Sequence, residues 1–460
     1  MSLLRISPFF APLLLSACAS VVTPGASDLV LAPETFSAAP AELDASPSDW
    51  IAAFEDPVLQ VLVAEALDAN PTVASALASY DAARAGARSA GAARLPTLDG
   101  SVGYTDQEPG NTGFSTGLEV NWQADVWGRL GDQARSGALT AEAARADWYG
   151  ARLSIAASVA RSWYALIAAS QQAELAQADV EARTNQLEIV ERRFQRGVVR
   201  SSDVRTARSA LASSEATLAS RLRAQANAAR VLEVTLGRYP SASIAAGAEL
   251  PALGALPNPG QPETLLARRP DVVAAQARLA AAGYSASAAQ KALYPGLGLR
   301  ASLADGGADI ADALNFDDLV KTVVGSISAP IFQGGRLRAE RDRVEAQAEQ
   351  LSANLVSTAL TALREAEDAI EADRRLAQRV DALTVASDEA REALALVQRQ
   401  YASGLSTIFE LIDAQTRQIS AQSALISARN ERVDNRIALH LAIAGDFSAG
   451  GGVTASNIEN

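Results

Sequence analysis

The sequence is poor in the residues that most catalytic and metal sites require. It contains one Cys, one His and one Met among 460 residues. A lone Cys cannot form a disulfide within the chain, and one His cannot build a His-rich metal site. Cys18 and His440 lie at opposite ends of the sequence, which disfavours a catalytic Cys–His pair. We therefore expect no metal and no cofactor, and composition leaves open only carboxylate chemistry.

An excess of positive charge and long apolar runs are also missing. The formal net charge of −13 disfavours a nucleic-acid partner. No run of about 18 residues is free of charged or strongly polar side chains, so no transmembrane helix is expected. Ala is instead very frequent, together with Leu, Arg, Glu and Gln, and this composition predicts long helices.

Residues 1–17 have the features of an export signal, with a positive charge followed by a short apolar stretch. The stretch ends in Leu15-Ser16-Ala17-Cys18, which resembles the lipobox of bacterial lipoproteins and implies acylation of Cys18 after cleavage. An ordinary secretory signal with an incidental Cys is the alternative. The Ala, Ser and Pro content of 18–48 predicts an extended, lipid-anchored tether.

An internal repeat dominates the remaining sequence. Four motifs recur in the same order, the first two at one offset and the last two at an offset eight residues longer. The pairs are Asn70-Pro71-Thr72-Val73 with Arg269-Pro270-Asp271-Val272, Leu95-Pro96 with Tyr294-Pro295, Gly128-Arg129-Leu130 with Gly335-Arg336-Leu337, and Phe194 to Gly197 with Tyr401 to Gly404. Convergent low complexity would not preserve such offsets. We expect one repeat over 49–245, a second over 246–445 and a flexible tail over 446–460.

Each repeat predicts a helix, two short strands, a very long helix, a turn and a returning helix. Alternating apolar and polar residues predict strands over 97–105, 114–123 and 297–303. The fourth strand, near 319–329, is ambiguous because its Val and Ile residues fall on both faces. The loop before it, 304–318, is longer than its counterpart, and we expect it to hold the eight extra residues.

Long helices are expected over 130–195 and 337–402, and each would extend on the order of 100 Å at ~1.5 Å per residue. The returning helices are expected over 202–237 and 406–444. Their Ala content, with spaced Leu, Ile and Val, is typical of closely packed coiled coils.

Four strands of about ten residues have the length of membrane-crossing barrel strands. Four strands cannot close a barrel, and open strand edges are not tolerated in lipid. Three chains would supply about twelve strands, an allowed even number. We therefore expect a mixed α/β membrane protein, mainly α. It would be a homotrimeric 12-stranded β-barrel, with four strands per chain. Outer membrane lipid would contact the apolar strand faces.

Several short motifs occur in a fixed order over about 45–445. They are Trp50, Phe54-Glu55-Asp56-Pro57, Asp125-Val126-Trp127-Gly128-Arg129, Arg268-Arg269-Pro270-Asp271-Val272, Ala292-Leu293-Tyr294-Pro295 and Pro330-Ile331-Phe332-Gln333-Gly334-Gly335-Arg336-Leu337. Together they resemble the TolC-like outer membrane factors, in particular the NodT-type efflux lipoproteins. The resemblance implies a lipid-anchored channel of the cell outer membrane that extends into the periplasm. It also implies that the barrel of the trimer is continued by a long α-helical coiled-coil periplasmic tunnel. It also implies a periplasmic adaptor (membrane fusion protein) and an inner-membrane pump of the RND type as partners, with passive export of drugs or other small molecules.

The resemblance implies a periplasmic gate at Glu410 and Asp413, which lie one helical turn apart. Three copies would form acidic rings that favour cations. Two structural alternatives use the same residues: Thr407 to Glu410 also fits a capping box, and Asp413 with Arg417 fits a helical ion pair. The family often has basic gate partners where this chain has Ser406 and Thr416.

The turns between the helices are the expected adaptor-docking tips. The residues implied by the resemblance are Gly197, Val198, Ser201, Gly404, Leu405 and Ser406. Gly ends one helix and Ser or Thr begins the next, which a plain helical hairpin would equally require.

Three other functions remain open at this point. A periplasmic adaptor lipoprotein would need one hairpin flanked by β-rich domains, and a non-pore structural coiled-coil lipoprotein would not need four alternating strands. A carboxylate-dependent cell-wall hydrolase would need a compact mixed domain that the sequence does not indicate. We therefore expect no enzyme.

Overall fold

The computed structural model describes residues 25–30, 32–38, 50–106, 113–311, 313 and 320–443. The predicted signal peptide, Cys18 and the predicted tail lie outside the described residues. The chain divides into two compact units. The first contains Met1–Leu31, Leu77–Asp147 and Asp271–Ala359, and the second contains Ala32–Ala76, Trp148–Pro270 and Leu360–Asn460.

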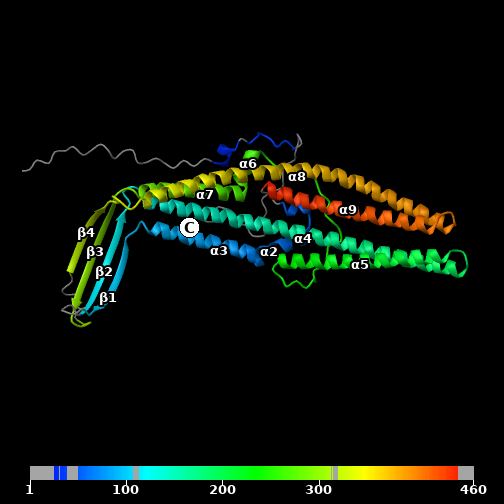
Figure 1. Ribbon diagram of the computed structural model, residues 1–460, viewed down its shortest axis with the longest axis horizontal. Coiled ribbons are helices and arrows are strands. Elements are labelled where there is room, and N and C mark those ends of the chain that lie inside the picture. Colours follow the sequence, from blue (N-terminus) through cyan, green and yellow to red (C-terminus); the bar gives the residue numbers. More distant parts are fainter. Residues whose placement is uncertain are drawn as a thin grey trace, which may run out of the picture. The chain divides into compact units, whose positions relative to one another are not determined.

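The first unit contains one four-stranded antiparallel sheet in the order β1-β2-β3-β4 (Figure 1). The strands are β1 (Thr97–Thr105), β2 (Gly113–Ala124), β3 (Gly296–Gly307) and β4 (Val320–Ser328). The four predicted strands are therefore confirmed. Within the described residues, β1 and β4 each pair with one strand only, so both outer edges of the sheet are open.

The cross-strand register gives this sheet one apolar and one polar face, because directly opposed residues of antiparallel strands point the same way. The large apolar residues of the first face are Leu98, Val102, Tyr104, Phe114, Leu118, Val120, Trp122, Leu297, Leu299, Leu303, Val323 and Ile327. In β4, Ile327 lies opposite Leu297 and Val323 lies opposite Ala301, so both belong to the apolar face. Val320 and Val324 belong to the polar face, which resolves the ambiguous strand.

One expectation about this region is wrong. β3 continues to Gly307, so the loop after it begins later than predicted. In addition, residues 329–335 join β4 to α8 (Arg336–Ala402), whereas residues 125–128 alone join β2 to α4 (Arg129–Gln195). The extra residues of the second half are therefore divided between two places and do not all lie in one loop.

The longer helices, which Figure 1 labels α3, α4, α5, α7, α8 and α9, form three pairs of equal length. Helices α3 (Pro71–Ala92) and α7 (Pro270–Lys291) have 22 residues each, and α4 and α8 have 67 each. Helices α5 (Ser201–Thr235) and α9 (Ile408–Ala442) have 35 each. The shorter elements are α1 (Ala26–Leu29), the 3₁₀ turn η1 (Ala52–Phe54), α2 (Pro57–Ala69) and α6 (Pro262–Arg268).

The core of the second unit brings together η1, α2, α4, α5 and α9. Trp50, Tyr164 and Ile437 are among its fully buried side chains. Asp56 caps α2 by accepting hydrogen bonds from the backbone of Val58 and Leu59 at 2.9 and 3.1 Å, and Pro57 fits the first helical position. The same carboxylate accepts a 2.7 Å hydrogen bond from the Trp163 indole on α4.

Two sets of polar contacts involve α8. The backbone N–H groups of Ser37 and Ala38 donate to the carboxylate of Glu367 at 2.7 and 2.9 Å. Part of the predicted tether is therefore docked on a helix. The second contact is a buried ion pair between Asp373 on α8 and Arg436 on α9, whose closest N–O distance is 3.0 Å. Arg436 also donates to the carbonyl oxygens of Gly254 and Ala255 at 3.2 and 2.8 Å.

Helix α4 contains one stretch of mean hydropathy 1.2 that is long and apolar enough to cross a membrane. Since 61% of that stretch is buried inside the protein, core packing accounts for its composition.

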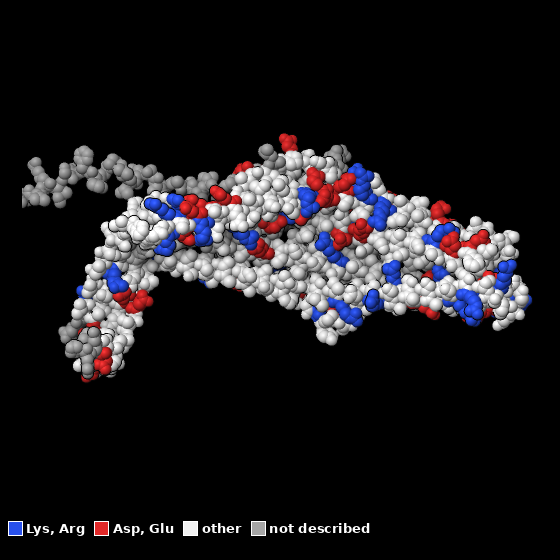
Figure 2. All heavy atoms as spheres, viewed as in Figure 1, with Lys and Arg blue, Asp and Glu red and all other residues white. Residues whose placement is uncertain are grey.

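Figure 2 shows basic and acidic side chains interspersed over the helices on the visible face, with no large area of one sign.

Candidate functional site

The turns that end α4 and α8 are built by the same backbone chemistry. Gly197 and Gly404 have φ values of 72° and 78°, which favour glycine. Val198 and Leu405 each donate to the carbonyl five residues earlier, at 2.9 and 2.8 Å, which is the Schellman arrangement. A Cβ at either glycine would meet nothing within 4 Å, so backbone conformation and not space requires glycine here.

The tips of both turns expose apolar side chains. Val198 is 68% exposed and Leu405 is 82% exposed. Ser201 is exposed and Ser406 is half-buried. The predicted tip residues therefore form two similar turns that each present one large apolar side chain to solvent. Adaptor docking stays a prediction.

An apolar cluster behind the tips joins the two hairpins. Its buried members are Val190, Val204, Ala207, Tyr401, Ile408 and Leu411. The guanidinium of Arg193 lies 4.7 Å from the centre of the Tyr401 ring and donates to the carbonyl oxygens of Tyr401 and Ala402 at 3.3 and 3.2 Å. A cation is favourable at the C-terminal end of α8. Sequence reasoning missed Arg193, because its acceptors belong to a helix about 200 residues away.

Glu410 forms the capping box that begins α9. Its carboxylate accepts from the Thr407 backbone N–H at 2.6 Å and from the Ser406 hydroxyl at 2.7 Å, and the Thr407 hydroxyl accepts from the Glu410 N–H at 3.3 Å. The Thr407 backbone hydrogen bond, followed by those of the two hydroxyls, lowers the pKa of Glu410. The capping alternative is confirmed, and the carboxylate is held ionised.

Asp413 forms the predicted helical ion pair with Arg417. Both side chains are exposed, at 57% and 69%. An exposed pair of this kind contributes little to stability, about 0.3–0.5 kcal/mol. Glu410 and Asp413 thus both lie on the exposed surface of α9 close to the tip, and their role as a gate stays a prediction.

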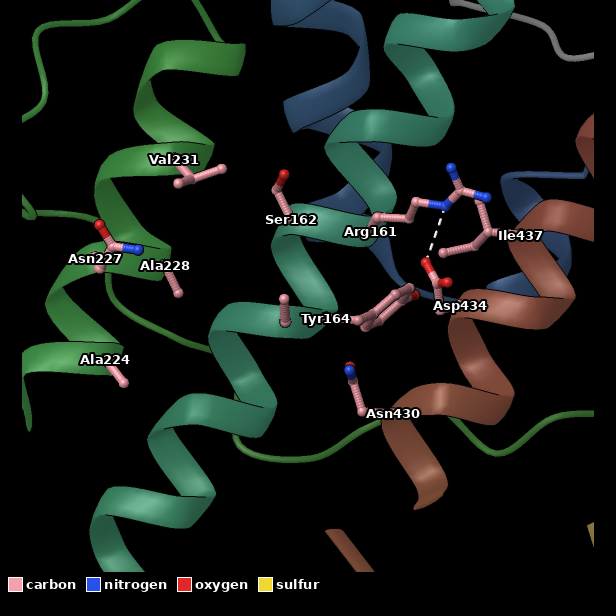
Figure 3. A pocket seen from close by; sticks show the side chains of 11 residues that line it. Arg161, Ser162, Tyr164, Ala224, Asn227, Ala228, Val231, Asn430, Asp434 and Ile437 are labelled. Carbon is pink, nitrogen blue, oxygen red and sulfur yellow. Dashed lines mark ion pairs between the residues drawn. The ribbon is translucent and has the colours of Figure 1, made fainter. Parts of the chain in front are cut away.

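A pocket of about 360 Å³ lies among α4, α5 and α9 (Figure 3). Its charged residues, Arg161 and Asp434, form an ion pair at 2.9 Å. The Tyr164 ring extends from α4 towards α9, and its buried hydroxyl has no hydrogen-bond partner in the described part of the chain. Burial, with a smaller contribution from Asp56, raises the pKa of Tyr164 well above its usual range. The Tyr164 phenol therefore stays neutral and does not supply a base in this pocket.

His440 lies in an aromatic cluster that the sequence did not reveal. Its ring stacks on Trp50, with centroids 5.7 Å apart, and meets the edge of Phe54 at 6.0 Å. Burial, together with the charge of Arg436, lowers the pKa of His440 to about 4. The imidazole is therefore neutral at the pH of ordinary growth.

Among the described residues, no group of three or more His, Cys, Asp and Glu side chains is placed to hold a metal ion.

Comparison with known proteins points in one direction. The family model described as "Outer membrane efflux protein" matches residues 62–238 and 262–445. The pyoverdine export outer membrane protein OpmQ of Pseudomonas aeruginosa is 30% identical over 98% of each chain. Nodulation protein T of Rhizobium leguminosarum bv. viciae is 28% identical over 97% of this chain and 94% of its own. A solved structure of the outer-membrane channel OprN is 26% identical, with a TM-score of 0.81 over 90% of this chain and 96% of its own.

Proposed function

Because this chain belongs to the outer membrane efflux protein family, we propose that three copies form a 12-stranded β-barrel continued by a helical tunnel through the periplasm. The chain is an outer membrane channel component of an efflux system, as its relatives and structural neighbours are. Its family is one of transport proteins, and the resemblance to TolC-like and NodT-type proteins is confirmed.

The open, two-faced sheet carries the proposal of a trimer. Its apolar face exposes large side chains, among them Val323 at 74% and Ile327 at 78%. Both outer strands leave backbone N–H and C=O groups unpaired at their edges, which lipid does not tolerate. Joining β4 of one chain to β1 of the next satisfies these groups and closes a barrel of about twelve strands, with the apolar face in lipid.

The remaining features fit the same assembly. Equal lengths of α3 and α7, of α4 and α8, and of α5 and α9 support two repeats over 49–245 and 246–445. Cys18 would be the acylated end of the tether. The exposed tips would contact a periplasmic adaptor and, through it, an inner-membrane pump, for which the RND type is our proposal. Passive export of small molecules would follow from a continuous wet lumen.

The trimer is tested by its resistance to detergent. Protein extracted from outer membranes is expected to migrate as a trimer in SDS without heating and as a monomer after boiling, because closed barrels resist SDS. The matched variant is Val323→Pro, which removes a ladder N–H from β4. It should abolish the trimer band. A wild-type protein that is monomeric and water-soluble without detergent, once deacylated, would contradict the proposed trimeric channel.

The gate is tested by conductance. Asp413→Ala should raise single-channel conductance in a planar bilayer several-fold, because it removes a ring of three charged side chains from the proposed constriction. Ser420, two turns farther along α9, gives the control Ser420→Ala. Equal conductance of Asp413→Ala and wild type would count against the gate and leave the ion pair with Arg417 as the role of Asp413.

Adaptor docking is tested by crosslinking at the tips. A Cys placed at Ser201 or Ser406, in a chain whose other Cys is the lipidation candidate Cys18, should form an adduct with a cognate adaptor carrying a partner Cys. A Cys at the exposed position Ser209, two turns from the α5 tip, serves as the control. Adducts at Ser209 alone, or at no position, would contradict docking through the tips.

A further inference from the structure

The polar face of the sheet carries three charged side chains, one on each of three neighbouring strands. They are Asp99 on β1, Glu119 on β2 and Arg300 on β3. Asp99 lies directly opposite Glu119, and Arg300 lies opposite Asn121, which is two residues from Glu119. The other positions on this face hold uncharged residues, mostly Gly, Ser and Thr. The three charges therefore stand out from a surface of short side chains.

Arg300 and Glu119 form a connected network with Asn121, and Asp99 lies beside it in the strand register. The Arg300 guanidinium lies 3.2 Å from the Glu119 carboxylate and donates to the Asn121 amide oxygen, also at 3.2 Å. The Asn121 amide nitrogen donates to Glu119 at 2.5 Å. Asp99 and Glu119 are like charges on directly opposed residues, an arrangement that is destabilising by itself. Arg300 offsets this repulsion but leaves a net charge of one negative unit per chain.

The opposite face has a different charge pattern. Its only charged residues within the four strands are Asp305 and Lys321. Both lie towards the end of the sheet where the loops 106–112 and 308–319 join the strands. In a membrane barrel, the lipid-facing surface at this end of the strands contacts polar headgroups, whereas the middle of that surface must be apolar. The charge pattern thus agrees with an apolar face in lipid and a polar face lining the lumen.

We propose that Asp99, Glu119 and Arg300 form a charge-selecting belt inside the barrel that favours cations over anions, separately from the gate at Glu410 and Asp413. This rests on the proposed trimer, since only closure of the barrel turns the polar face into a pore lining. Arg300 is the tuning residue, because it neutralises one of the two carboxylates in each chain. Removing its charge makes the lumen more negative, and removing that of Glu119 makes it less negative.

The measurement is the reversal potential of reconstituted trimers in a KCl gradient near about 10 to 100 mM, where the Debye length is roughly 10–30 Å. Arg300→Gln should raise the K⁺/Cl⁻ permeability ratio about two- to threefold, since three unit charges act through a wide aqueous pore. Glu119→Gln should lower it by a similar factor, and Arg300→Lys should keep the wild-type ratio. Both shifts should fade near 1 M salt, where the Debye length is about 3 Å.

Lys321→Gln is the matched control, because it removes the same charge from the same sheet on the lipid side. It should leave the permeability ratio unchanged. The belt is refuted if Arg300→Gln keeps the wild-type ratio in trimers that conduct, or if Lys321→Gln shifts the ratio equally. Failure of the proposed trimeric channel would give a different result, because the wild-type protein would then show neither a heat-sensitive trimer band nor channels.

Discussion

Replacing Arg436 with Met is expected to lower the free energy of unfolding by roughly 3–5 kcal/mol per protomer, because it leaves the buried carboxylate of Asp373 without its main partner. Asp373 and Arg436 are 6% and 5% exposed. Arg432 also lies near Asp373, but its closest N–O distance of 4.0 Å makes it a weaker partner than Arg436. The loss should appear as a lower urea midpoint for the disappearance of helical circular dichroism in detergent.

Two further variants identify the cause of that loss. Arg379→Met breaks an ion pair with Glu431 that joins the same two helices but is exposed at 52% and 54%, so it should cost at most about 1 kcal/mol. The double variant Asp373→Leu/Arg436→Met removes both buried charges and should recover much of the stability. A double variant as unstable as Arg436→Met would show that the bonds to Gly254 and Ala255, and not the charge pair, hold this region.

His440 is expected to titrate near pH 4 in the folded protein and near 6.5 in the unfolded chain. Because the folded pKa is lowered, the unfolded state binds the proton first as the pH falls. Stability is therefore retained above about pH 6.5 and decreases as the pH falls towards 4, by up to about 3 kcal/mol. Since the chain has a single His, histidine-selective NMR labelling reports this titration alone, provided that the purification tag contains no His.

The pH dependence of stability gives an independent check. Carboxylates also titrate at low pH, so the informative quantity is the difference in the free energy of unfolding between wild type and His440→Gln. That difference should change between about pH 6.5 and 4 and be constant above this range. A folded-state midpoint near 6.5 would mean that the imidazole is solvated and that its contacts with Trp50 and Phe54 do not persist in solution.

The regular elements were predictable because their signals are local. The predicted helix ends at 195 and 402 match α4 and α8, where helix-forming residues give way to a Gly turn. The strands were visible for the same reason, since alternation is read along one segment. The face of β4 was not predictable, because Val320, Val323 and Val324 carry no period, and only pairing with β3 places them.

The contacts that position the candidate sites could not be read from the sequence. Arg193 and Tyr401 meet across two hairpins, and Ser37 meets Glu367 across 330 residues. The neighbours of Arg300 could not be read from the sequence either, because they lie on another strand. The register with Asn121 places Arg300 on the polar face. Glu410 presents a different difficulty. Its local motif was visible in the sequence, but the motif is compatible with both a helix cap and a gate.

The two unpaired edges of the sheet bear on how the protein reaches its membrane. A single protomer that entered lipid would expose the unpaired outward backbone groups of β1 and β4, two strands of nine residues each, so we expect it to remain at the bilayer surface until other protomers are present. Insertion then requires several chains at once, so its rate rises steeply with the local concentration of newly delivered chains. Acyl anchoring, by confining those chains to two dimensions, would hasten their encounter well before any pore exists.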